Sequence, residues 1–193
     1  AIDAMTHPWR YSGGHIHISL HEASFGNYPR YNWFKDKLKQ MLYIKLLDLR
    51  LGLPQSAMFY HPGQWQRRKY YGKAGEFRFQ EYGNGWSGIE YRTPSAEIFN
   101  NNGLMSWAFG IVRDTFYHFE EYAQLWDKGI ESDLRAAINH GEGIAKLLKH
   151  EVKGFYSPET IKVMRAHKAV HEFSMPEHLY STAEKGWGEW ANE

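Results

Sequence analysis

The stretch Gly14-His15-Ile16-His17-Ile18-Ser19-Leu20 alternates strictly between polar and apolar side chains. Because successive side chains of a strand point to opposite faces, this alternation predicts a half-buried strand with its aliphatic residues on one face. His15, His17 and Ser19 then share the other face. Two imidazoles at this spacing are either solvated polar residues or part of a site for a charged ligand, and the alternation alone favours the solvated face.

Two further stretches alternate in the same way, Glu76-Phe77-Arg78-Phe79-Gln80 and Gly88-Ile89-Glu90-Tyr91-Arg92-Thr93. Between them lies Tyr82-Gly83-Asn84-Gly85-Trp86, which is rich in turn-forming residues. The pattern predicts two strands joined by a hairpin-like reversal, the second ended by Pro94.

Charged residues share a face in each of these strands, Glu76 with Arg78 and Glu90 with Arg92. Such a face is unfavourable unless it is solvated or binds a charged group. One interpretation is a sheet that lines a polar cavity. The other is an open sheet face with cross-strand ion pairs of small energy.

Helical periodicity marks residues 33–51, where it predicts an amphipathic helix ended by Gly52 and Pro54. Beyond residue 100 this periodicity dominates the chain. It predicts helices at 102–123, 131–138, 143–152 and 157–171, the last capped by Ser157. The fold class is therefore α+β, with an antiparallel sheet that lines a polar cavity and helices packed behind it.

Composition excludes several classes of protein. The 193 residues include no cysteine, so a metal could be held only by His, carboxylates or water. A net charge of +1 argues against nucleic-acid binding. Arg67-Arg68-Lys69 is the one compact basic cluster, and with its neighbouring aromatic residues it leaves nucleic-acid binding as a minor alternative. Mean hydropathy is −0.64 and no apolar run approaches a membrane span, so we expect a cytoplasmic protein without membrane partners.

Three motifs, taken in order, resemble the glutamine synthetase superfamily. Residues 13–19 resemble its Gly-x-His-x-His-x-Ser strand. Residues 89–94 are similar to its Arg-x-Glu-x-Arg-x-Pro strand, with Gly88 in place of the first Arg. The Gly-rich segment 71–78, ending in Arg78, precedes that strand as it does in the phage and bacterial carboxylate-amine ligases, or amidoligases. The resemblance covers residues 12–110.

The resemblance implies a ligase that phosphorylates a carboxylate with ATP and lets an amine attack the acyl phosphate, which forms an amide or isopeptide bond. Its cofactors would be ATP and Mg²⁺ or Mn²⁺, because phosphoryl transfer needs a divalent ion and cationic donors. By the same resemblance His15 and Glu90 would bind the metal. The partners would be small-molecule or peptide carboxylates and amines.

The other site residues are also carried over from the resemblance. His17 would hydrogen-bond nucleotide phosphate or substrate, and Ser19 would lie toward the nucleotide. Arg78 would clamp phosphate, with Arg68 as a second candidate. Arg92 would hold the acidic substrate, since a guanidinium can bind a carboxylate in a bidentate fashion.

One part of the family pattern has no match. A Glu-x-Glu strand is implied before the histidine strand, whereas residues 1–10 contain only Asp3 as a carboxylate. We therefore expect the C-terminal part of a longer ligase that can form homo-oligomers and that lies in the host cytoplasm if it is viral. Its glutamine synthetase-like catalytic core would cover residues 1–125 and its helical extension residues 126–193. The alternative is a structural or virion-associated protein that retains the ligase fold without turnover.

Overall fold

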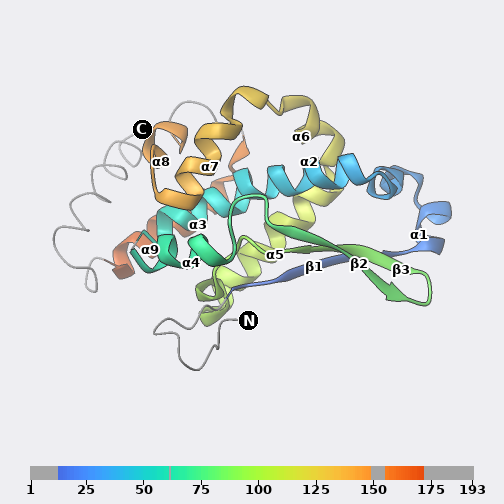
Figure 1. Cartoon of the computed structure of the whole chain (residues 1–193), viewed down its shortest axis with the longest axis horizontal. Coiled ribbons are helices and arrows are strands. Elements are labelled where there is room, and N and C mark those ends of the chain that lie inside the picture. The colour runs from blue at the N-terminus through green and yellow to red at the C-terminus, as the bar shows by residue number, and fades with distance from the viewer. Residues whose placement is uncertain (1–12, 61, 149–154, 172–193) are drawn as a thin grey trace.

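A three-stranded antiparallel sheet lies against a layer of helices in the computed structural model, which describes residues 13–60, 62–148 and 155–171 (Figure 1). Its strands are β1 (Ile16–His21), β2 (Phe77–Gly83) and β3 (Trp86–Tyr91), in the spatial order β1-β3-β2. The α+β class is confirmed, although helices make up most of the described chain.

The predicted reversal between β2 and β3 is confirmed. Gly83, Asn84 and Gly85 have φ angles of 76°, 49° and 77°, which lie in the left-handed region that glycine and asparagine tolerate best. β2 continues beyond its predicted end at residue 80, and its pairing with β3 shifts register between Glu81 and Gly83. The hairpin thus places β3 between β2 and β1.

Register decides which residues lie side by side across the three strands. Glu90 of β3 pairs with His17 of β1 and with Arg78 of β2. The next row joins Tyr91 with Ile16 and Phe77. Adjacent rows point to opposite faces, so the polar row and the apolar row lie on opposite sides of the sheet.

The predicted helix at 33–51 is wrong at both ends. A 3₁₀ helix, η1 (Pro29–Lys35), precedes α2 (Lys37–Leu47), whose first turn is capped by the Asp36 carboxylate. The chain then passes through a π-helical turn, η2 (Asp48–Gly52), directly into α3 (Leu53–Met58). Gly52 and Pro54 do not end the helix, because Gly52 keeps right-handed helical angles and Pro54 falls in the first turn of α3, where no N–H is needed.

The predicted helix at 102–123 is divided at His118 into α5 (Asn102–Tyr117) and α6 (Phe119–Leu125). The break brings the Phe119 ring onto Trp33, with centroids 3.9 Å apart. α7 (Glu131–His140) agrees with its prediction, and α9 (Pro158–His171) begins after Ser157, whose hydroxyl accepts from the Thr160 amide. α8 (Ile144–Lys146) covers only part of the predicted 143–152, and residues 149–152 of that prediction lie outside the described residues.

Four short elements had no counterpart in the sequence prediction: α1 (Glu22–Asn27), α4 (Pro62–Tyr70), η3 (Ala96–Asn100) and η4 (Lys128–Ile130). α4 is the one that bears on the site, because it carries the basic cluster at residues 67–69.

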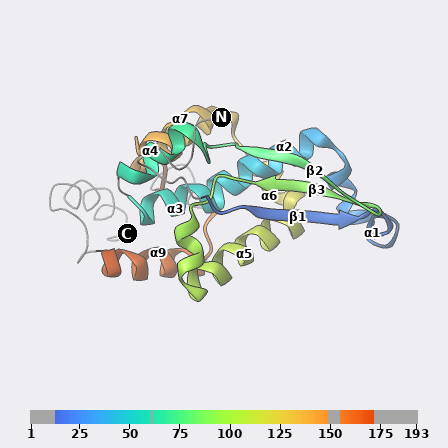
Figure 2. The ribbon, with the colours of Figure 1, turned by 60° about the horizontal axis from the view of Figure 1, so that its bottom comes forward.

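The apolar row of the sheet faces the helices and joins the main core. Ile16, Ile89 and Tyr91 are buried there together with side chains of α2 and α5. The same hydrophobic cluster includes Leu134 and Met164, so the described parts of the two predicted units share one core. Figure 2 shows β1 at one edge of the sheet, with α5 running beside it.

No helix within the described ranges is both long and apolar enough to span a bilayer.

Candidate functional site

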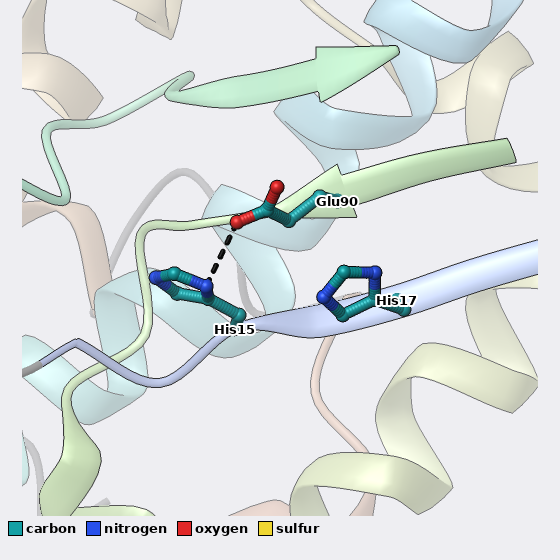
Figure 3. A group of neighbouring side chains, drawn as sticks. All are labelled: His15, His17 and Glu90. Atoms are coloured by element: carbon teal, nitrogen blue, oxygen red, sulfur yellow. Dashed lines mark ion pairs between the residues drawn. The ribbon is translucent and has the colours of Figure 1, made fainter. Parts of the chain in front are cut away.

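The polar face of the sheet gathers two histidines and a glutamate. His15 directly precedes β1, His17 is the second residue of β1, and Glu90 comes from neighbouring β3, as Figure 3 shows. One potential ligand atom from each of the three residues lies within 4.8 Å of the other two. Strict alternation in both strands, together with their register, brings these groups to one face.

His15 and Glu90 are in direct contact. Nδ1 of His15 lies 2.8 Å from Oε1 of Glu90, whose side chain is only 6% exposed. The other Glu90 oxygen accepts a hydrogen bond of 2.8 Å from the side-chain amide of Gln80. Two ligands that bind one ion at about 2.1 Å and at right angles lie about 3 Å apart, so this pair has a separation that suits a shared divalent ion.

The charge state of His15 also suits a ligand. Burial lowers the pKa of this imidazole; the Glu90 carboxylate acts in the opposite direction, and Arg92, His17 and Arg78 lower it further. A lowered pKa keeps the ring neutral near neutral pH, and only the neutral ring has a lone pair to offer a metal.

Arg92 is fixed by its neighbours. Its Nη1 lies 2.8 Å from Oε1 of Glu76, and its Nε lies 3.5 Å from Glu90. The guanidinium also covers the Tyr71 ring at 4.3 Å, and its Nε donates to the Tyr71 hydroxyl. The same ring stacks on His15, with centroids 5.4 Å apart. Tyr71 therefore supports both the predicted metal ligand and the predicted substrate arginine.

Glu76 is positioned by the turn that precedes β2. Its Oε2 accepts hydrogen bonds from the amides of Gly72 and Lys73, at 2.6 and 3.1 Å. Gly72 has a φ of 72°, and a Cβ there would fall 2.1 Å from the Arg67 guanidinium, so glycine is required at this position. The predicted pairing of Glu76 with an arginine is thus formed with Arg92.

Arg78 lies directly across from Glu90 and is exposed, and no ion pair to it is formed within the described part of the chain. Ser19 lies on β1 opposite Gly88. A Cβ at residue 88 would lie 2.0 Å from the Ile18 carbonyl oxygen, so this position requires glycine. Close approach of β1 and β3 therefore excludes a side chain there.

His17 has a partner that the sequence did not suggest. Its Nδ1 lies 2.6 Å from the hydroxyl of Tyr82, which comes from the far end of β2. Gln80 already lies on this face of the predicted strand, and extending that strand by two residues would have added Tyr82. Tyr71 lies outside any strand, and no sequence pattern points to it.

Arg68 does not join the site. It is 2% exposed, and its guanidinium donates to the carbonyls of Gly72 and Thr93 and to the Ser56 hydroxyl. Burial, with the neighbouring Arg67 charge, lowers the pKa of Arg68 to about 9. Arg67 is 6% exposed and also donates to Thr93, so these two arginines hold the turn before β2 and do not form a surface for phosphate or nucleic acid.

The geometry brings together five predicted residues, His15, His17, Arg78, Glu90 and Arg92, and places Ser19 farther along β1. Such a face can bind a divalent cation and hold anionic oxygens beside it. A scan against protein-family models and searches among curated proteins and solved structures found no match to this chain.

Proposed function

We propose that this sheet face is the metal- and phosphate-binding half of an ATP-dependent carboxylate-amine ligase with a glutamine synthetase-like fold. One observation carries the proposal: the His15, His17 and Glu90 cluster is flanked by Arg78 and Arg92 on a single face of the sheet. Metal ligands bordered by arginines are what transfer of a phosphoryl group between two oxygens requires.

The reaction would run in two balanced steps. The γ-phosphoryl group of ATP passes to a substrate carboxylate oxygen, which releases ADP. The amine then attacks the acyl carbon, phosphate leaves, and the amine loses a proton. A bound divalent ion neutralises phosphate oxygens during such transfer. His15 and Glu90 would hold that ion.

The arginines would hold the anionic groups in place. Arg78 has its guanidinium exposed beside Glu90 and is free to donate to phosphate oxygens. A substrate carboxylate would share Arg92 with Glu76, its present partner. His17 would donate to phosphate or substrate once its hydrogen bond with Tyr82 is released.

Metal binding is the first test. We expect isothermal titration calorimetry to detect Mn²⁺ binding, and weaker Mg²⁺ binding because imidazole suits Mn²⁺ better than Mg²⁺. Glu90→Gln should weaken Mn²⁺ binding at least about tenfold, since it removes the charged ligand. Glu120→Gln is the matched control, because Glu120 is exposed and, among the residues that the structure describes, pairs only with Lys39 across α2 and α6. Equal affinities for the two variants would refute the metal site.

Turnover is the second test. We expect ATP with Mn²⁺ or Mg²⁺ to release ADP and phosphate when a panel of acids and amines is supplied, and Arg78→Ala to abolish this release without loss of metal binding. Intact metal binding without phosphate release from any pair of substrates would remove the ligase and leave a metal-binding protein.

A non-catalytic structural or virion-associated protein that retains the ligase fold is the second candidate. It is favoured by the single carboxylate, Glu90, that the described residues contribute to the cluster. Recovery of the chain at fixed stoichiometry in a purified particle, without bound nucleotide, would support this candidate over the ligase.

A further inference from the structure

A groove runs along the free edge of β1. Its cavity of about 620 Å³ is lined by five consecutive β1 residues, 16–20, and by residues of α5. Since the sheet order is β1-β3-β2, one side of β1 has no strand partner among the described residues. An edge strand presents unpaired N–H and C=O groups, which readily pair with another extended chain.

The two walls of this edge groove differ in chemistry. Ile18, Leu20, Val112 and Phe116 make the wall toward the helices apolar. The opposite wall carries His17, which also belongs to the metal cluster. A ligand that fills the groove would therefore lie next to the polar face of the sheet.

The charge of the groove favours an anionic occupant. Arg113 lines it and is exposed, and none of its lining residues is acidic. A second cation stands at the rim, where the Arg30 guanidinium covers the rings of Tyr31 and Tyr117 at 4.8 and 5.6 Å. Tyr117 is 50% exposed, so aromatic surface is also available there.

We infer that the edge groove binds an extended acidic peptide, which adds to the sheet as a strand beside β1. A peptide strand points alternate side chains to opposite faces, so apolar residues would enter the wall toward α5 while acidic residues face His17. Arg113 of α5 would then attract the peptide through its overall negative charge and not through direct contact with these carboxylates. β1 has six residues and strands rise about 3.3 Å per residue, so the groove suits a peptide of about six residues. The identity of the substrate rests on the proposed ligase function: a side-chain carboxylate of the bound peptide is the acid that the ligase activates.

The probe is a fluorescein-labelled, end-capped peptide of four Val-Glu repeats, followed by fluorescence anisotropy without ATP or metal. Two control peptides separate the contributions of charge and backbone: one has lysine in place of glutamate, and the other has N-methyl groups on alternate amides. The acidic peptide should bind, and both controls should bind at least about tenfold more weakly, because one loses charge complementarity and the other strand pairing.

Gly110→Leu provides a blocking variant. Gly110 lies on α5 and lines the groove, and a Cβ there meets nothing within 4 Å, so a leucine side chain fits at this position without disturbing the core. It should reduce affinity at least about tenfold, whereas Gly110→Ala should change it little. Arg113→Glu should also weaken binding, and Arg165→Glu, on an exposed position of α9, is its control.

Several results would overturn the inference. The inference is wrong if the folded protein does not bind the acidic peptide, if it binds the lysine or N-methylated peptide equally well, or if Gly110→Leu keeps full affinity. Hydrogen exchange supplies another result. If the β1 amides that point away from β3 are already protected without peptide, the edge is covered by another segment of the polypeptide, or by a second copy when dilution removes the protection. Glu90→Gln should keep peptide binding, so failure of the metal site and failure of the groove are distinguished.

Discussion

Asp48 links the core to the site, and its ionisation makes a measurable prediction. Its side chain is 3% exposed, accepts a hydrogen bond of 2.8 Å from the Tyr91 hydroxyl, and accepts another from the Gly75 amide. Gly75 belongs to the turn that leads to Glu76, the partner of Arg92. Burial raises the pKa of Asp48 from 3.8 to about 6, against the effect of the hydrogen bonds it accepts.

The direction in which pH changes the folding stability follows from the raised pKa of Asp48. The folded state holds the Asp48 proton more tightly than the unfolded state, so this stabilising contribution is complete below pH 3.8 and is lost as pH rises through about 6. The gap between the two pKa values corresponds to about 3 kcal/mol. Part of this contribution is already lost at pH 4, so the wild-type protein should lose about 2 kcal/mol of stability between pH 4 and pH 7, compared with a variant whose side chain at this position cannot ionise.

Urea unfolding of the wild type and of Asp48→Asn at these two pH values measures this loss. We expect the free energy of unfolding of the wild type to fall by about 2 kcal/mol relative to that of Asp48→Asn when pH rises from 4 to 7. Asp133→Asn, at a side chain that is 53% exposed, is the control and should show little pH dependence of its difference. Parallel pH profiles for the wild type and Asp48→Asn would refute the reasoning.

Three further predictions concern the strands, the aromatic support and a helix cap. Gly88→Ala should unfold the sheet or cost several kcal/mol in urea unfolding, because its Cβ would lie 2.0 Å from the Ile18 carbonyl; a loss below about 1 kcal/mol would contradict the close approach. Tyr71→Phe keeps the ring under His15 and should bind Mn²⁺ nearly as the wild type does, whereas Tyr71→Leu should bind it at least about threefold more weakly in calorimetry; equal affinities would exclude a supporting role. Ser157→Ala should lower the free energy of unfolding by about 1 kcal/mol, since the hydroxyl caps α9, and Ser157→Asn should restore it.

The sheet could largely be predicted from the sequence because alternation fixes the face of every side chain. His15, His17 and Glu90 were assigned to polar faces in this way, and the Gly83 to Gly85 reversal identified the hairpin. Alternation does not say which strands are neighbours or in which register. The contact between His15 and Glu90 depends on both, and only the structure provides them.

The helical part was predicted less well, for a physical reason. Gly52 and Pro54 are residues that usually end helices, but a π-helical turn accommodates them and continues the chain into α3. Arg68 was misplaced for a related reason. Its charge suggests a surface role, whereas in the interior its Nη1 donates to the carbonyls of Gly72 and Thr93.

The row across β1 and β3 has a thermodynamic consequence. His17 and Glu90 are neighbours in the sheet although their strands are far apart in the chain, so an ion held between these strands would act as a reversible staple that the unfolded chain lacks. Linkage then requires each tenfold rise in free metal above its dissociation constant to add about 1.4 kcal/mol to the stability of the fold. The melting temperature of this protein would thereby report the metal concentration around it, and a chelator would lower it.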